Sequence, residues 1–317
     1  MATHLPSSTP ALTRRALLGL IIPSTLFTVL RHAYRTVDHY WIQDVSTEAQ
    51  AAIGSATFVL ILFAGFFEVL SAGAAPIIAR HVGAEQPEGV RKTLGAALGG
   101  VVVTSGLLMI VGGLGAGWLT AALGLEGQTA VECERYIETL SWTGLPLVLM
   151  PLVDQAFIAM GSARIPFILN AVILGLNCIL TPLLVHSAGM GVTGAALASN
   201  GATAVGAIIG GWLLARKTQL QPKHLRLGSE LKRVIRVGMP MGISVVSYAL
   251  VYWAMLYTSI SPLGPHINAA LGIGFSVLEG FAWPCFHGVS LAVASFVGRS
   301  IGAGRPEEAD RAIRLAF

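Results

Sequence analysis

Hydrophobic residues run through this chain in long stretches that contain no charged side chain. Residues 93–125 form one such stretch of 33 residues, and residues 165–215 form another of 51. A bilayer core of roughly 30 Å needs about 20 apolar residues to be crossed by one helix. The pattern therefore predicts one membrane-spanning helix in the first stretch and two in the second.

Polar and charged residues divide the rest of the chain into further apolar segments of similar length. The pattern predicts eight spans in all, at residues 15–38, 52–79, 93–121, 136–160, 165–185, 192–215, 235–260 and 268–298. Glycine occupies 37 of the 317 positions, as expected where helices approach one another closely in lipid. The expected fold class is an all-α polytopic membrane protein.

Composition and charge support this class. The chain is 54% hydrophobic and 11% charged, whereas a soluble domain is about one quarter charged. Seventeen of the twenty Lys and Arg residues fall on one side of the predicted topology, which predicts a cytoplasmic N-terminus in the plasma membrane. The net charge of +4 reflects this bias, so we expect no nucleic-acid partner.

A short charged phrase occurs twice. Residues 79–92 read ARHVGAEQPEGVRK and residues 298–311 read GRSIGAGRPEEADR, in which Gly83, Ala84, Pro87 and Glu88 recur 219 positions on. Pro23 and Pro240 extend the match into the spans at an offset of 217. The two copies are separated by six predicted spans, an even number, so they run in the same direction. Parallel repeats of this kind place a substrate cavity between two helical bundles.

The repeat also predicts the domain organisation. We expect a cytoplasmic tail at residues 1–14, an N-lobe of six transmembrane helices at 15–216, and an inter-lobe linker at 217–234. Residues 235–317 would form a partial C-lobe that contains helices 7 and 8 and the start of helix 9. In this interpretation the chain is a transporter truncated after about eight of twelve helices.

Several short motifs, in order and in register with the spans, resemble the MATE (multidrug and toxic compound extrusion) family. They are Pro23 and Asp38 in the first span, Ala51-Ala52-Ile53-Gly54, Arg80-x2-Gly83-Ala84, Asn177-x4-Pro182-Leu183-Leu184, Gly191-x2-Gly194-Ala195-Ala196-Leu197-Ala198, Gly238-x-Pro240, Pro284, Gly288 and Gly302-Ala303. The resemblance covers nearly the whole chain.

This resemblance implies a two-lobe bundle of tandem parallel six-helix repeats, the second incomplete here. It implies secondary active antiport that exports small amphipathic, often cationic compounds in exchange for H⁺ or Na⁺. The expected partners are the lipid bilayer and a small organic substrate. We expect a monomer, no cofactor, no bound metal beyond the coupling ion, and no enzymatic activity.

The resemblance also implies a cation-coupling site at Asp38. An ionisable side chain in a span is costly, so it is a functional candidate; the alternative is a structural charge near the membrane boundary. Asn177 and Thr181, at i and i+4, share a helix face and could complete the site. Proton-coupled relatives often carry an aspartate where this chain has Thr181, which leaves a two-carboxylate site in doubt and the coupling ion open.

Other polar residues within the spans are secondary candidates for the substrate cavity. Arg35 and Tyr34 lie on the first span, and three further acids are Glu68, Asp154 and Glu279. Each acid is a candidate for ion coupling or substrate contact, or is satisfied structurally inside the bundle. The aromatic side chains could hold an organic cation or form interfacial belts.

Two other interpretations stay open. A flippase for a lipid or lipid-linked oligosaccharide, from the same wider superfamily, would need several basic residues in its cavity; Arg31 and Arg35 are the only pair within the spans. An inactive truncated fragment is the other, because the second bundle is incomplete. An integral membrane enzyme would need a cluster of reactive residues at one membrane face, and the sequence contains none.

Overall fold

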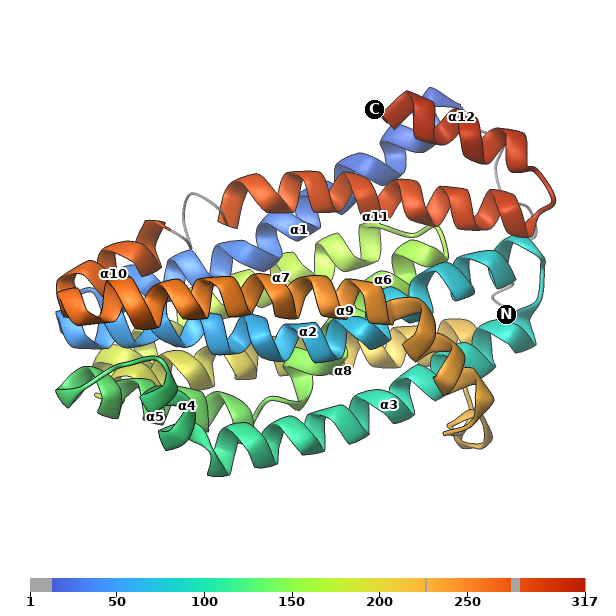
Figure 1. The fold of residues 1–317 in the computed structure, drawn as a ribbon. Helices are drawn as coiled ribbons and strands as arrows, with labels where there is room; N and C mark the ends of the chain where they lie inside the picture. The colour runs from blue at the N-terminus through green and yellow to red at the C-terminus, as the bar shows by residue number, and fades with distance from the viewer. Residues whose placement is uncertain (1–12, 226, 275–279, 317) are drawn as a thin grey trace.

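The computed structural model describes residues 13–225, 227–274 and 280–316, and folds them into a bundle of long helices (Figure 1). No strand occurs among these residues. The elements are α1 (Arg14–Ile42), α2 (Thr47–Gly83), α3 (Pro87–Leu114), α4 (Ala116–Ala122), α5 (Gly127–Trp142), α6 (Leu145–Ala159), α7 (Arg164–Pro182), η1 (Leu183–Ser187), α8 (Gly191–Thr218), η2 (Pro222–His224), α9 (Ser229–Met255), η3 (Leu256–Ile260), η4 (Ser261–Leu263), α10 (Pro265–Gly274), α11 (Gly280–Gly302) and α12 (Pro306–Ala316). The fold is therefore all-α, as the sequence predicts.

The helix starts follow local sequence signals. Thr13 caps α1, where its Oγ1 accepts a hydrogen bond of 3.1 Å from the amide of Ala16. Ser46 caps α2 in the same way, with a bond of 3.0 Å from the amide of Ala49. Serine and threonine are favoured at such positions because their oxygens satisfy otherwise unpaired amides of the first turn.

Six of the described helical segments are long and apolar enough to cross a membrane, and the α5–α6 pair makes a seventh if it is counted as one span. The sequence predicts eight. The eighth, at 268–298, contains residues 275–279, which lie outside the described ranges; α10 and α11 flank them.

Two predicted spans are broken in the structure. The expected helix at 136–160 is two helices, α5 and α6, which meet at a bend of 58°. Pro146 explains the break, because its ring would clash with the carbonyl of Trp142, where α5 ends. The expected helix at 93–121 is likewise divided, at Gly115, into α3 and the short α4.

The repeated phrase forms the same turn twice. In both copies three successive amides after the helix bond to carbonyls three to five residues back. The paired bonds are Ala84 N to Arg80 O at 2.9 Å and Ala303 N to Arg299 O at 2.9 Å, Glu85 N to Val82 O and Gly304 N to Ile301 O, both at 3.1 Å, and Gln86 N to His81 O at 2.8 Å and Arg305 N to Ser300 O at 2.9 Å. A new helix then begins at Pro87 or at Pro306.

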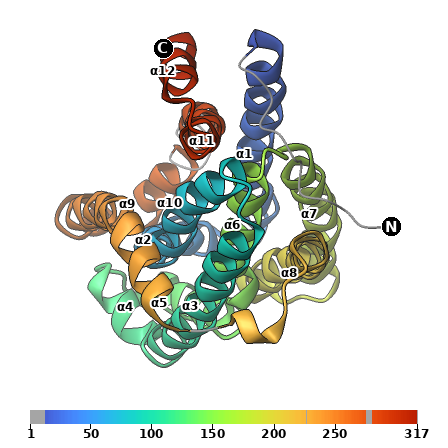
Figure 2. The ribbon, with the colours of Figure 1, turned by 90° about the vertical axis from the view of Figure 1, so that its right-hand side faces the viewer.

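The two copies pack against one another reciprocally. Helix α1 packs against α11, the counterpart of α2, while α2 packs against α9, the counterpart of α1 (Figures 1 and 2). Gly83 lies against the carbonyl of Arg299, and Gly302, its counterpart, lies against the carbonyl of Arg80. A two-fold axis between the copies produces this exchange of partners.

Gly54 and Gly272 locate that axis. They are equivalent positions of the two copies, 218 residues apart, and their backbones touch: a Cβ added to Gly54 would lie 2.8 Å from the Cα of Gly272. A residue can touch its own counterpart only close to the axis that relates the copies. The tandem parallel repeat read from the sequence is thus present in the fold.

Candidate functional site

Asp38 lies in the last part of α1, with 2% of its surface exposed, and its carboxylate receives three side-chain hydrogen bonds. The amide Nδ2 of Asn177 donates to Oδ1 at 3.3 Å, and the hydroxyl of Thr181 donates to the same oxygen at 3.2 Å. The hydroxyl of Ser199 donates to Oδ2 at 2.6 Å. We call these four residues the Asp38 site.

Three helices build the Asp38 site. Helix α1 carries the acid, α7 presents Asn177 and Thr181 one turn apart on the same face, and α8 presents Ser199. All three partner residues are buried. The structure therefore brings together the three residues that the sequence proposes for cation coupling.

Ser199 is the member of the site that sequence reasoning missed. Its hydroxyl also accepts a hydrogen bond of 3.1 Å from Asn177, so it joins two of the other members. The available signal was weak: it is one polar residue in an apolar span, and hydroxyls in helices often bond only to their own backbone. Thr203, one turn later, does so, with a bond of 2.7 Å to the carbonyl of Ser199.

The donor set at Asp38 suits a proton or a small hard cation. The side-chain oxygens are a carboxylate, two hydroxyls and the amide oxygen of Asn177, which is buried and has no hydrogen-bond partner among the described residues. Oxygen donors of these kinds are preferred by hard cations. A small cavity of about 20 Å³ borders Asp38 and Ser199, enough for one water-sized particle.

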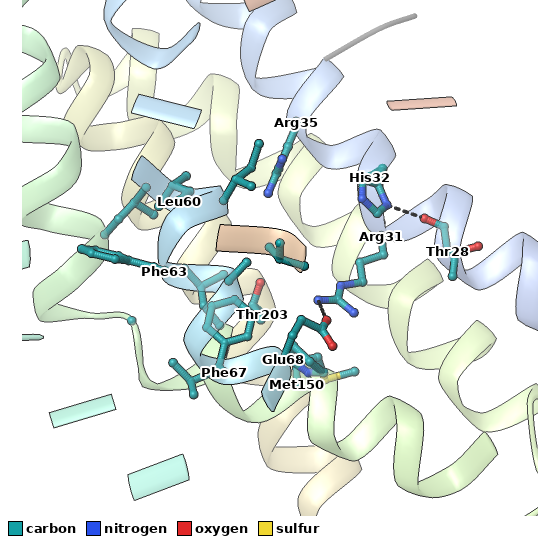
Figure 3. Close-up of a pocket in the computed structure, with 18 of the residues that line it drawn as sticks. Thr28, Arg31, His32, Arg35, Leu60, Phe63, Phe67, Glu68, Met150 and Thr203 are labelled. Carbon is teal, nitrogen blue, oxygen red and sulfur yellow. Dashed lines mark hydrogen bonds and ion pairs between the residues drawn. The ribbon is translucent and has the colours of Figure 1, made fainter. Parts of the chain in front are cut away.

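A much larger cavity of about 380 Å³ lies nearby, between helices of the first unit and helices α9 and α11. Figure 3 shows it with Arg31, Arg35 and Glu68 among its walls. We call it the central cavity. Most of its lining is apolar, from side chains such as Phe63 and Phe67, which is typical of a site for an amphipathic ligand.

Glu68 is held by protein groups. Its Oε2 accepts hydrogen bonds of 3.0 Å from Gln155 and 2.9 Å from Ser71, and its Oε1 lies 4.0 Å from a guanidinium nitrogen of Arg31. Arg31 and Glu68 point toward one another in Figure 3. Glu68 therefore lines the central cavity, as the sequence proposes, but with its charge already paired.

Asp154 is fully buried and is not part of the Asp38 site. The amide of Asn170 bonds to both of its oxygens, at 3.1 and 3.2 Å, and also to the carbonyl of Pro166. Because Asn170 lines the central cavity, Asp154 lies one side chain behind the cavity wall. Glu279 and the side chain of Tyr34, two further candidates, lie outside the described part of the structure.

The arginines of α1 form no ion pair with Asp38 among the described residues, although the charge of Arg35 acts on this carboxylate at longer range. The sequence raises the alternative of a charged cluster in which Arg31 and Arg35 neutralise this acid. No ion pair joins either arginine to Asp38 among the described residues: Arg31 is paired with Glu68, and Arg35 faces both the central cavity and the small cavity beside Asp38.

Known proteins share this arrangement of helices. The family model described as MatE matches residues 23–183 and 240–317. The chain belongs to the MATE family of transporters. Members of this family are multi-pass membrane transporters rather than enzymes, which agrees with the apolar helices of the bundle.

Individual relatives of this MATE protein are distant but cover it almost completely. It is 24% identical over 325 residues to the "Probable multidrug resistance protein NorM" of Thermotoga maritima, covering 99% of this chain and 69% of the relative. It is 22% identical over 314 residues to the "FAD transporter" of Shewanella oneidensis, covering 96% and 68%.

A solved structure shares the fold. A MOP superfamily transporter from Pyrococcus furiosus superposes with a TM-score of 0.84 at 21% identity, covering 95% of this chain and 68% of that one. The binding pocket of that transporter is described as having reverse polarity.

Proposed function

We propose that this MATE protein is a secondary active antiporter that exports small amphipathic compounds in exchange for H⁺ or Na⁺. In this proposal the Asp38 site binds the coupling ion and the central cavity binds the substrate. The relatives named as multidrug resistance proteins support export of small compounds.

The observation that carries the proposal is the adjacency of the two cavities. Arg35 lines both, together with Leu60, Leu140 and Leu147. When an ion binds to or leaves Asp38, the charge of the Asp38 site therefore changes, and only the shared wall separates this site from the substrate. Antiport requires such communication, because the two ligands must exchange at a bundle interface that opens to one side at a time.

Two features support Asp38 as the ion ligand rather than a structural charge. It is almost completely buried, although an ionised carboxylate inside a span is costly, about 2.5–3.5 kcal/mol on insertion scales. Its partners are neutral donors that can accommodate either protonation state or share oxygens with a cation. We propose the same cytoplasmic orientation of the N-terminus that the distribution of Lys and Arg predicts.

Transport in proteoliposomes tests the proposal. We expect the protein to move an amphipathic dye when a proton or a sodium gradient is imposed separately, and Asp38→Asn to abolish this ion-driven component because the amide cannot release a proton or supply a negative ligand. Asp44→Asn is the matched control, since Asp44 is exposed just beyond α1 and should behave as the unmodified protein.

The outcomes separate the alternatives. Undiminished transport by Asp38→Asn would remove the site assignment. Absence of transport by the unmodified protein under both gradients would contradict antiport and favour the inactive-fragment interpretation. The flippase alternative loses support from the pairing of Arg31 with Glu68, which leaves one unpaired arginine in the described cavity wall to meet a pyrophosphate.

A further inference from the structure

We propose that the substrate carries an anionic group on a planar aromatic framework, and that Arg35 is the residue that binds this group. The inference rests on the proposed function, because it takes the central cavity as the substrate site. It names a substrate class opposite in charge to the organic cations that the family resemblance implies.

The charges on the cavity wall carry the first step. Among the described lining residues the charged side chains are Arg31, Arg35 and Glu68. Arg31 and Glu68 are paired with each other, and Gln155 and Ser71 also donate hydrogen bonds to Glu68. Arg35 forms no hydrogen bond and no ion pair within 4 Å to a described residue, and its charge interacts at longer range with Asp38, which lies outside the central cavity. The charge that the described wall offers to a ligand is therefore positive.

The surroundings of Arg35 favour the binding of an anion to its guanidinium. Apolar side chains such as Leu60 and Leu147 line the cavity with it, so its guanidinium lacks part of the solvation it would have in water. A carboxylate or phosphate can restore two parallel hydrogen bonds, a geometry that the planar guanidinium favours. A simple cation in the same position would meet a like charge.

An aromatic wall provides the second half of the site. Trp283 and His287 of α11 are stacked, with ring centroids 4.4 Å apart and an interplanar angle of 17°. His32 of α1 also lies near Trp283, with the ring centroids 5.5 Å apart and the two rings tilted by 60°. All three line the central cavity. Flat rings of this kind favour stacking with a planar aromatic ligand.

The positions of the two halves fit one ligand. His32 and Arg35 are three residues apart on α1, so they lie on the same face of the helix. A planar substrate that stacks on the Trp283–His287 pair, beside His32, can therefore present an acidic substituent to Arg35. Arg35 itself precedes Asp38 by three residues, which places the bound anion beside the ion site on which the proposed function depends.

Equilibrium binding to the purified protein tests the inference without requiring transport. Fluorescein and rhodamine 6G share a xanthene ring system but carry opposite charges, so fluorescence anisotropy compares charge at nearly constant shape. We expect fluorescein to bind at least tenfold more tightly than rhodamine 6G. Arg35→Gln should weaken fluorescein binding by about tenfold or more, the effect of losing a charged hydrogen-bonded partner, and should leave rhodamine 6G binding unchanged or strengthened.

Two further variants identify the cause. Arg35→Lys keeps the charge but loses the planar fork, so it should retain part of the fluorescein affinity. Arg135→Gln removes an arginine that is largely exposed and paired with Glu132, and should leave both dyes unaffected.

Tighter binding of rhodamine 6G than of fluorescein would overturn the inference, as would an equal effect of Arg35→Gln and Arg135→Gln on fluorescein. Failure of the proposed function is a separate result: it is loss of ion-driven transport in proteoliposomes, while the binding preference in detergent stays measurable.

Discussion

The hydroxyl of Ser199 determines how the carboxylate of Asp38 is held. Its hydrogen bond of 2.6 Å is the shortest of the three that reach Asp38, and it also receives a bond from Asn177. The remaining two donors both approach Oδ1, so Ser199 alone holds Oδ2 among the described residues. Removal of this hydroxyl would therefore leave Oδ2 without a donor among the described residues.

Ser199→Ala gives a prediction that distinguishes the two coupling ions. If the ion is a proton, loss of a donor to the charged carboxylate favours the protonated form, and half-maximal transport should move to higher pH. If the ion is Na⁺, loss of a ligand oxygen should weaken the apparent sodium affinity by about tenfold or more, since a hydrogen bond or contact of this kind is worth about 1.5–3 kcal/mol. Transport rates across pH and sodium titrations measure both.

Ser55→Ala is the matched control for that experiment. Ser55 is buried in α2, and its hydroxyl has no hydrogen-bond partner among the described residues. Its removal should leave both titrations unchanged. Identical titration curves for Ser199→Ala and the unmodified protein would show that the hydroxyl has no role in ion binding.

At this scale the sequence predicts the acid and its α7 partners but not the whole site. Asn177 and Thr181 could be paired because i and i+4 spacing fixes a common helix face whatever the tertiary structure is. The contact of Ser199 with Asp38 could not be predicted, because it depends on the rotation of α8 about its axis relative to α1 and α7. The pairing of Arg31 with Glu68, rather than with Asp38, depends in the same way on the packing of α1 against α2.

Between the helices, close approach depends on glycine residues. Gly73 lies against the carbonyl of Val234, and Gly238 lies against that of Val69, so α2 and α9 meet backbone to backbone. Contacts of this kind replace the hydrophobic effect, which does not drive association between helices in lipid. They also explain why glycine is so frequent in this chain.

Gly83→Ala tests the contact between the two repeated turns. The added methyl group would overlap the carbonyl oxygen of Arg299, which belongs to a helix backbone and cannot rotate away. We expect a loss of about 1–3 kcal/mol in stability, seen as a lower melting temperature of the purified protein. Gly302→Ala, which meets the carbonyl of Arg80, should have a similar effect.

Gly106→Ala is the control, because a Cβ at this position of α3 meets nothing within 4 Å. It should be neutral or stabilising by up to about 1 kcal/mol, the difference in helix propensity between the two residues. Equal melting temperatures for Gly83→Ala and Gly106→Ala would contradict the close packing of the two turns.

The sequence predicts helices better than their interruptions. Uncharged stretches locate α3, α7 and α8 because lipid excludes charge over the full length of a span. No charged residue marks the break between α5 and α6 itself; the local signals are Thr143-Gly144 and Pro146. A proline inside a membrane helix is often tolerated, so its presence does not by itself decide between a continuous and a broken span.

Across the whole molecule the two copies exchange partners around an axis near Gly54 and Gly272. The central cavity is lined by helices of both copies, and the two glycine contacts lie near opposite ends of α2: Gly54 with Gly272 near its start, and Gly83 with the turn of the second copy at its end. A transporter that exposes its site alternately must open these two contacts in turn, never both together.

A disulfide between α2 and α11 tests this at the end that holds the turns. A Cβ added to Gly298 would lie 2.7 Å from the Cβ of Ala79, close enough for a bridge after a small adjustment. In a background with Cys133, Cys178 and Cys285 replaced by alanine, we expect Ala79→Cys with Gly298→Cys to stop transport on oxidation and to regain it on reduction.

Each single cysteine variant should transport under both conditions. Transport by the fully oxidised double variant would mean that α2 and α11 need not separate at this end, and the alternating opening of the two contacts would have to be abandoned.

The contact of Gly54 with Gly272 also bears on how a duplicated gene can change. Elsewhere the copies differ: Asp38 corresponds by register to Met255, and Arg35 to Tyr252, so one half has charged side chains where the other has an apolar or an aromatic one. The two copies can differ at such positions because the equivalent residues pack against different neighbours. Near the axis, Gly54 and Gly272 contact each other, so a side chain at either position would overlap the backbone of the other copy. Changes at these two positions are therefore restricted together.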